Sequence, residues 1–401
     1  MPDQRMLKLA DVLVNYSAEV RPGDWVLIQG DVAALPLLAE VQRLVTRAGG
    51  HPTVMLSAEE IDEAFLSEAS PEQLSWLSPL EGIINTQLDV SIRIVAPGNT
   101  RALSGIDPAR PRAFQQARRD LQRNRMQRPA TGKLRWVLTQ FPCAALAQEA
   151  DMSLRDYENF VYAATFADQP DPVAAWETHI AQLARRSDYL NAKQYAALHY
   201  TAPGTDLTIG LPSGHIWKSA RDTSAGGIDF TPNLPTEEVF TLPHRAQVNG
   251  TVASTKPLNL NGALVDGFSL RFVDGRAVEV QASTGGEPLH RMLDTDEGAR
   301  FLGEVALVPH NSPIAQSGLL FYNTLFDENA SCHIALGRAY QFTLRGGEQM
   351  SEIEFQQAGG NVSIVHTDFM IGSEAMDIDG ITADGQREPV MRAGNWAFEV
   401  E

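Results

Sequence analysis

The chain has 401 residues, of which 43% are hydrophobic and 20% charged, and this ordinary globular composition excludes a largely disordered chain. At roughly 150 residues per domain, the length predicts two or three domains, and we expect two. The 32 Lys and Arg residues against 50 Asp and Glu residues give a net charge of -18, which opposes binding to nucleic acid or to an anionic membrane surface.

The first half of the chain alternates between helix and strand patterns. Apolar residues recur at helical spacing over residues 6–20 and 37–48, and longer helical patterns occupy residues 151–195. Short apolar strands are predicted at residues 25–29, 52–56, 82–85 and 90–95. This alternation predicts an α/β domain with a mostly parallel sheet over residues 1–200.

The turn after the first predicted strand does not have a phosphate-binding sequence. It reads Gln29-Gly-Asp-Val-Ala-Ala and matches neither of the two glycine-rich patterns that cradle phosphates. We therefore interpret Gly30 as simple turn geometry and expect no nucleotide cofactor.

A basic segment runs from Arg110 to Arg135, with nine basic residues against one acid, Asp120. We interpret it as a solvated helix face whose cations pair with acids elsewhere. A patch that binds anions or nucleic acid is the alternative.

The pattern changes to a period of two in the second half of the chain. Leu207, Ile209 and Leu211 alternate with polar residues, and residues 268–281 predict a hairpin with Asp274-Gly275 at its tip. A short helix is predicted at residues 287–293 and a strand at 304–309. Residues 201–401 should therefore form an α+β domain that is mainly antiparallel β.

One strand of this half combines apolar and ionisable residues on one face. Alternation over residues 361–370 places on that face Val362, Ile364, His366, Asp368 and Met370. Burying an ionised carboxylate is costly unless a partner or a metal neutralises it. A metal-binding pair explains His366 and Asp368, and a structural His–Asp hydrogen bond is the alternative.

Other candidate ligands flank turns and strand ends. Glu328 and His333 lie on either side of a polar turn that leads into an apolar strand, although Glu328 could simply be exposed and His333 an ordinary strand residue. Glu238 and Glu304 each precede or begin an apolar strand, and each taken singly could be a surface acid. Together these Glu, His and Asp residues form the mixed set that two divalent cations need.

Four segments, in order, resemble the thermophilic aminopeptidases, the aminopeptidase T and aminopeptidase S family of metallopeptidases. They are Asn233-Leu-Pro-Thr-Glu-Glu-Val-Phe-Thr, Gly303-Glu-Val-Ala-Leu-Val-Pro-His, residues 318–337 and Val365-His-Thr-Asp-Phe-Met-Ile-Gly. The opening Tyr16-Ser-Ala-Glu-Val-Arg-Pro-Gly-Asp is also similar, so the likeness covers nearly the whole chain.

The resemblance implies an aminopeptidase that acts on peptides with a free N-terminus and works as a homodimer. It implies two divalent metal ions per chain, Zn, Co, Mn or Mg, with the ligands Glu238, Glu304, Glu328, His333, His366 and Asp368. We choose Glu238 over Glu237 because the spacing to the later ligands fits better, and adjacent residues of an extended segment point oppositely.

The implied reaction is hydrolysis by metal-activated water. Glu238 and Glu304 are the candidate general bases, and Tyr340 is expected to donate a hydrogen bond to the oxyanion; a Tyr packed in a strand is the alternative. Two rival functions stay open: another dinuclear hydrolase, such as an amidase or phosphoesterase, and a non-catalytic protein that binds a small ligand.

The sequence also indicates a compartment. Cys143 and Cys332 are too few for a disulfide framework and suit a reducing environment. The first residues contain no apolar signal region, and no apolar run reaches the roughly 18 residues of a membrane span. We expect a cytoplasmic protein without a membrane or nucleic-acid partner.

Overall fold

The structure is a computed structural model that describes residues 3–121, 125, 128, 132–260, 263–321 and 324–400. The chain forms two compact units. Unit 1 comprises Met1–Glu177 and Arg221–Pro235, and unit 2 comprises Thr178–Ala220 and Thr236–Glu401. The division at residue 200 that the sequence suggests stays a prediction.

Unit 1 is built on a parallel sheet with the order β2-β1-β3-β4-β9. All of its neighbouring strands pair in parallel, as predicted for an α/β fold. The three central strands β1, β3 and β4 are largely buried, which for β1 and β3 fits their near-continuous apolar sequences. The strand bounds are β1 Trp25–Asp31, β2 His51–Ser57, β3 Val90–Val95, β4 Arg135–Gln140 and β9 Asn233–Leu234; β7 (Asp222–Thr223) and β8 (Asp229–Phe230) pair separately.

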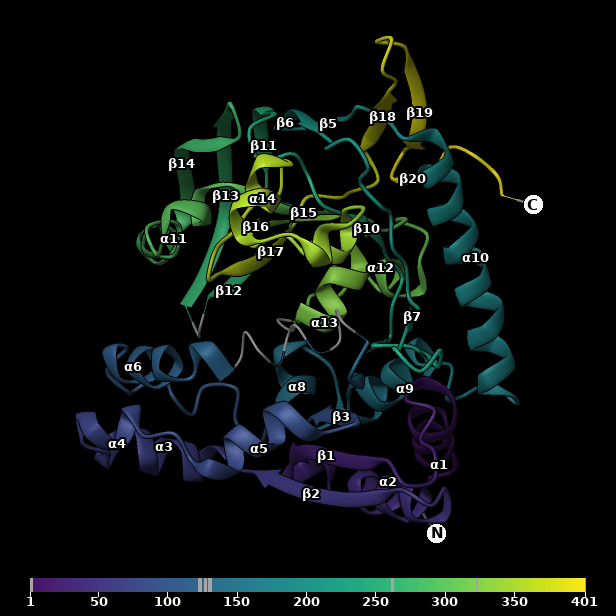
Figure 1. Cartoon of the computed structure of the whole chain (residues 1–401), viewed down its shortest axis with the longest axis vertical. Coiled ribbons are helices and arrows are strands. Elements are labelled where there is room, and N and C mark those ends of the chain that lie inside the picture. The colour runs from purple at the N-terminus through teal and green to yellow at the C-terminus, as the bar shows by residue number, and fades with distance from the viewer. Residues whose placement is uncertain are drawn as a thin grey trace. The chain divides into compact units, whose positions relative to one another are not determined.

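Amphipathic helices accompany this sheet. Of the predicted apolar stripe, α2 buries Leu37, Leu38, Val41 and Val45, whereas Leu44 and Ala48 are half-buried. The helix contacts β1 and β2, which run beside it in Figure 1. α1 continues directly into a π-helical turn over Val12–Ser17. The helices are α1 Gln4–Asp11, α2 Leu35–Arg47, α3 Glu59–Glu68, α4 Pro71–Ser75, α5 Pro79–Gln87, α6 Ala109–Ala117, α8 Ala144–Glu149, α9 Leu154–Ala164 and α10 Pro172–Lys193, the last of which continues into unit 2.

The strand predicted at residues 82–85 is wrong, because these residues lie inside helix α5. Ser78 caps the helix in a capping box with Glu81, and Pro79 occupies the first helical turn. The short run Gly-Ile-Ile-Asn has no period long enough to distinguish a strand from a helix, so the capping residues upstream decide its structure.

The basic segment makes specific contacts within unit 1. Arg118 pairs with Glu81 at 2.7 Å, and Arg135 pairs with Asp24 at 2.6 Å. Arg110 donates to two carbonyls at the end of α3. Arg118 and Arg135 thus pair with acids elsewhere in the unit, as expected, whereas Arg110 bonds to backbone carbonyls. Arg123 lies outside the described residues.

Unit 2 is dominated by antiparallel sheets, as predicted. The larger sheet has the order β12-β13-β11-β6-β5-β18-β19-β20, with β14 paired to β13. The predicted hairpin is formed by β13 and β14, and both Asp274 and Gly275 have positive φ at its tip. The strands are β5 Ala197–Ala202, β6 Thr205–Gly210, β11 Val248–Ala253, β12 Leu258–Leu260, β13 Ala263–Val273, β14 Arg276–Thr284, β18 Asp377–Ile381, β19 Arg387–Arg392 and β20 Asn395–Trp396.

A smaller antiparallel sheet with the order β10-β15-β16-β17 carries the candidate ligands. Its strands are β10 Val239–Thr241, β15 Leu302–Leu307, β16 His333–Gly337 and β17 His366–Met370. The short helices of unit 2 are α11 Gly286–Leu293, which confirms the predicted helix and contacts β13 and β14, α12 Pro313–Gln316, α13 Thr324–Asp327 and α14 Glu352–Gln357.

The strand predicted from residue 361 begins only at His366, so Val362 and Ile364 do not extend its buried face. Asn361 donates side-chain hydrogen bonds to Gly298 O and Gly337 O, and Ser363 bonds to Asp296. These side-chain bonds hold residues 361–365 in an irregular course, and Ile364 is exposed.

Candidate metal centre

The small sheet of unit 2 brings together candidates that lie far apart in the sequence. Glu238 immediately precedes β10, Glu304 is in β15, and His333 opens β16. His366 and Asp368 are two residues apart in β17. Figure 1 shows these strands side by side, so one sheet positions five of the six predicted ligands.

The pairing register places these side chains on one face. Glu304 pairs with Ala335, which pairs with Asp368, and His366 pairs with Gly337. Residues directly opposite one another point to the same side of a sheet. Because the middle strand offers only Ala335 and Gly337 at these positions, the longer side chains of the flanking strands have room to converge.

A β-bulge at Gly303 directs Glu304 to this face. Leu302 pairs with Leu336 and Glu304 with Ala335, so the register shifts by one residue between them. Regular alternation would leave Glu304 on the same face as Leu302, and the bulge reverses it. A Cβ at position 303 would lie 2.2 Å from Arg338 O, so the close approach of the backbone requires glycine.

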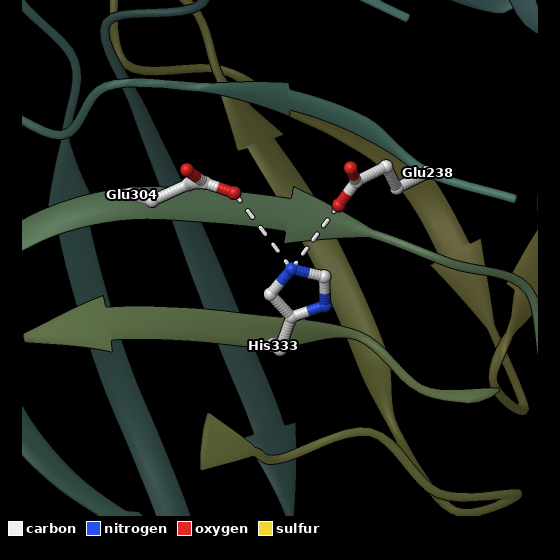
Figure 2. Close-up of side chains that lie close together, drawn as sticks. All are labelled: Glu238, Glu304 and His333. Atoms are coloured by element: carbon white, nitrogen blue, oxygen red, sulfur yellow. Dashed lines mark ion pairs between the residues drawn. The ribbon is translucent and has the colours of Figure 1, made fainter. Parts of the chain in front are cut away.

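Two carboxylates converge on the ring of His333 (Figure 2). Its Nε2 lies 3.2 Å from Glu238 Oε2 and 3.7 Å from Glu304 Oε1. The other oxygen of Glu304 lies 3.5 Å from His366 Nε2, which is 3.4 Å from Asp368 Oδ1. Glu304 therefore belongs to two ligand groups at once, one with Glu238 and His333 and one with His366 and Asp368.

Both imidazoles are oriented through their other nitrogen. His333 Nδ1 lies 3.1 Å from Ser331 O, and His366 Nδ1 lies 2.7 Å from Arg338 O. Because a carbonyl only accepts, each Nδ1 carries a proton, and in the neutral ring the lone pair of Nε2 faces the carboxylates. Lone pairs that face carboxylate oxygens need a proton or a metal ion between them. Although burial lowers the pKa of both imidazoles, the carboxylates outweigh it and raise the pKa of His333 well above its usual value and that of His366 to about 9, and a bound metal ion would take the place of the proton. Nδ1 bonded to a carbonyl is the outer-shell arrangement typical of metal-binding histidines.

The donor set fits divalent metal ions. Ligand atoms about 2.1 Å from a tetrahedral ion lie about 3.4 Å from one another, close to the separations found here. Asp368 Oδ1 is buried and has no hydrogen-bond partner among the described residues, so it has the unsatisfied lone pairs of a ligand.

Comparison with known proteins identifies the chain. It matches the thermophilic metalloprotease (M29) family over residues 2–396. The chain belongs to that family.

Named relatives of this thermophilic metalloprotease are aminopeptidases. Aminopeptidase AmpS of Bacillus subtilis (strain 168) is 47% identical and covers 98% of this chain and 99% of its own length. Aminopeptidase 2 of Geobacillus stearothermophilus is 42% identical, with 99% of both chains covered. The solved structure of wild-type AmpT from Thermus thermophilus matches with a TM-score of 0.89 at 38% identity, over 98% of this chain and 99% of that one. The resemblance and fold class predicted from the sequence are confirmed.

Glu328 lies beside the same centre of the metalloprotease, in the turn η4 (Glu328–Ala330) that follows α13. Burial raises its pKa well above the usual range, and the nearby charges of Glu238 and Asp368 raise it further. Burial likewise raises the pKa of Glu304, an effect that His333 and His366 partly offset. Bound cations would relieve the electrostatic repulsion between these buried carboxylates, so the raised pKa values indicate a cation-binding site.

Tyr340 lies next to His366, with ring centroids 4.8 Å apart, but it is not in a strand. It follows β16, opens the turn η5 (Gln341–Thr343), and stacks on Phe342. Burial raises the pKa of its hydroxyl well above 10, and the charges of Glu304 and Asp368 add to this. The hydroxyl is therefore protonated and able to donate.

Glu237 points away from its neighbour. Its Oε2 lies 3.5 Å from His179 Nε2, whereas Glu238 Oε2 faces His333. The geometry thus favours Glu238 as the member of the pair that belongs to the centre.

Three further residues beside the centre were not predicted from the sequence. Gly303 forms the bulge, and His179 and Asn329 contact the backbone next to Glu238. For Asn329, its position directly after Glu328 was the only signal in the sequence. For His179, which lies in a helix of mixed polarity, the sequence gave no signal.

Proposed function

We propose that this metalloprotease is an aminopeptidase that binds two divalent cations through Glu238, Glu304, Glu328, His333, His366 and Asp368. The observation that carries the proposal is the sharing of Glu304 by two ligand groups. With all four carboxylates ionised and both imidazoles neutral, as ligands must be, the set would carry a charge of -4, which two divalent cations would balance. A buried group of carboxylates without such compensation would be strongly destabilising.

Two such ions, when bound, make water nucleophilic near neutral pH and polarise the scissile carbonyl. Glu238 or Glu304 would accept the proton of the attacking water and pass it to the leaving amine. The protonated hydroxyl of Tyr340 would donate a hydrogen bond to the oxyanion of the tetrahedral intermediate.

The aminopeptidase relatives support peptides with a free N-terminus as substrates. The mixed carboxylate and imidazole ligands would accept Zn, Co, Mn or Mg. A homodimer and a cytoplasmic location complete the proposal. The two free, buried cysteines support the location. Within the described ranges, no helix has both the length and the apolar character to cross a bilayer.

Replacing Tyr340 by Phe should lower kcat for an aminoacyl chromogenic amide by on the order of 10²-fold, the effect of removing one oxyanion donor. KM and the bound metal should change little, because the aromatic ring still packs between Phe342 and His366. The measurement is steady-state kinetics beside metal content. An unchanged kcat would assign Tyr340 a packing role only.

A substrate panel tests the proposed function. The purified protein should hydrolyse aminoacyl amides, spare N-blocked peptides and phosphate esters, and contain two divalent ions per chain by elemental analysis. Hydrolysis of phosphate esters instead would indicate another dinuclear hydrolase. Full activity after extended chelation, or no bound metal and no hydrolysis, would contradict the proposal.

A further inference from the structure

The peptide group between Thr236 and Glu237 is held at both ends by side chains from distant parts of unit 2. His179 Nε2 lies 2.8 Å from its carbonyl oxygen, Thr236 O. The N–H of the same peptide group, which belongs to Glu237, donates a 2.6 Å hydrogen bond to Asn329 Oδ1. Buried backbone groups usually find partners in a sheet or helix, so a peptide bonded at both ends by side chains is unusual.

His179 approaches from helix α10. The carbonyl of Thr236 can only accept, so the ring carries its proton on Nε2 and donates. The same nitrogen is 3.5 Å from Glu237 Oε2, and the side chain of Glu237 is thereby kept on the α10 side.

Asn329 approaches from the turn that carries Glu328. Its side chain is fully buried, and its Nδ2 donates to Leu325 O at 2.7 Å. Its amide is thus bonded to helix α13 through Nδ2 and to the N–H of Glu237 through Oδ1. Asn329 therefore links the segment of Glu238 to that of Glu328.

The direction of Glu238 depends on how this segment is held. The side chains of Glu237 and Glu238 reach His179 and His333 respectively, so a rotation of the whole segment about its own axis would turn Glu238 away from His333 and Glu237 toward it. The segment is tightly enclosed, with Thr236, Glu237 and Glu238 all buried.

We propose that His179 and Asn329 are positioning residues that clamp the Thr236–Glu237 peptide, so that Glu238 faces His333 and keeps its spacing to Glu328. This inference rests on the proposed metal centre. Neither residue is in a ligand group; each acts through the backbone that carries a ligand.

Co²⁺ binding to the metal-free full-length protein tests the clamp, measured by competition with a chromophoric chelator and by the visible Co²⁺ spectrum. The variants are His179→Leu, Asn329→Leu, their combination, and His179→Gln, which retains a donor for Thr236 O. Asn191→Leu is the matched control. Asn191 also bonds both backbone groups of one residue, Trp217, from helix α10, and its hydrogen bonds within the described part of the chain do not reach a segment that carries a ligand.

Each Leu variant should weaken Co²⁺ binding by about 10- to 100-fold, as expected for a lost outer-shell partner. The double variant should lose little more than either single one, because both residues hold one peptide group. His179→Gln should recover most of the affinity, and Asn191→Leu should lower thermal stability without changing the affinity.

Wild-type affinity in both Leu variants would overturn the clamp while leaving the proposed function intact. Absence of Co²⁺ binding to the wild type would instead contradict the proposed function itself. If Asn329→Leu does not fold by circular dichroism, the comparison of His179→Leu with His179→Gln decides, since equal affinities for the two would contradict the clamp.

Discussion

Replacing Glu304 by Gln should reduce turnover of an aminoacyl chromogenic amide by on the order of 10³-fold, or about 4 kcal/mol of transition-state stabilisation. The two oxygens of Glu304 face His333 and His366 separately, so one carboxylate serves both ligand groups. An amide has the same shape but is neutral and can offer only one of its two atoms as a ligand. Bound metal should therefore fall below two ions per chain.

Steady-state kinetics and elemental analysis of Glu304→Gln measure both effects, with circular dichroism to check the fold. Glu297→Gln is the matched control, since Glu297 is a largely exposed acid of the same unit that pairs with Arg245 at 3.0 Å. Its activity should equal that of the wild type. A Glu304→Gln variant with two bound ions and normal turnover would exclude Glu304 as a bridging ligand.

The fold could be predicted from the sequence wherever a periodic pattern was long. The apolar stripe of α2 and the alternation through β13 and β14 each extend over enough residues to identify the element. Short runs were less informative, since residues 82–85 fit a strand or a helix equally and Ser78 and Glu81 decide in favour of the helix. At residues 361–365 the sequence alternates as in a strand, but hydrogen bonds of the Asn361 and Ser363 side chains hold this stretch in an irregular course, and the strand β17 begins only after it.

The candidate site was predictable from local pattern only in part. His366 and Asp368 share a face because they are two residues apart on one strand. The orientation of Glu304 depends on a bulge set by the close approach of Gly303 to Arg338, a contact across 35 positions that no local pattern records. For the same reason, side chains that bond to distant backbone, such as those of His179 and Asn329, could not be identified.

The same substitution should have a large effect at Glu238 and a small effect at its neighbour Glu237. Glu238→Gln removes a charge that faces His333 at 3.2 Å, and we expect at least about a 100-fold loss of metal affinity with a comparable loss of turnover. Glu237→Gln should keep turnover within a few-fold of the wild type. Burial raises the pKa of Glu237 to about 8, so its carboxyl is mostly protonated near neutral pH and a neutral amide replaces it with little change.

The comparison of these two variants requires metal-binding titrations and kinetics on proteins of matched fold. Each variant serves as the other's control, because both substitutions fall on the same buried segment and each replaces one carboxylate by an amide. A larger loss in Glu237→Gln than in Glu238→Gln would reverse the assignment and place Glu237 in the centre. That outcome would require the segment of Thr236, Glu237 and Glu238 to rotate about its own axis, which the hydrogen bonds of its first peptide group to His179 and Asn329 oppose.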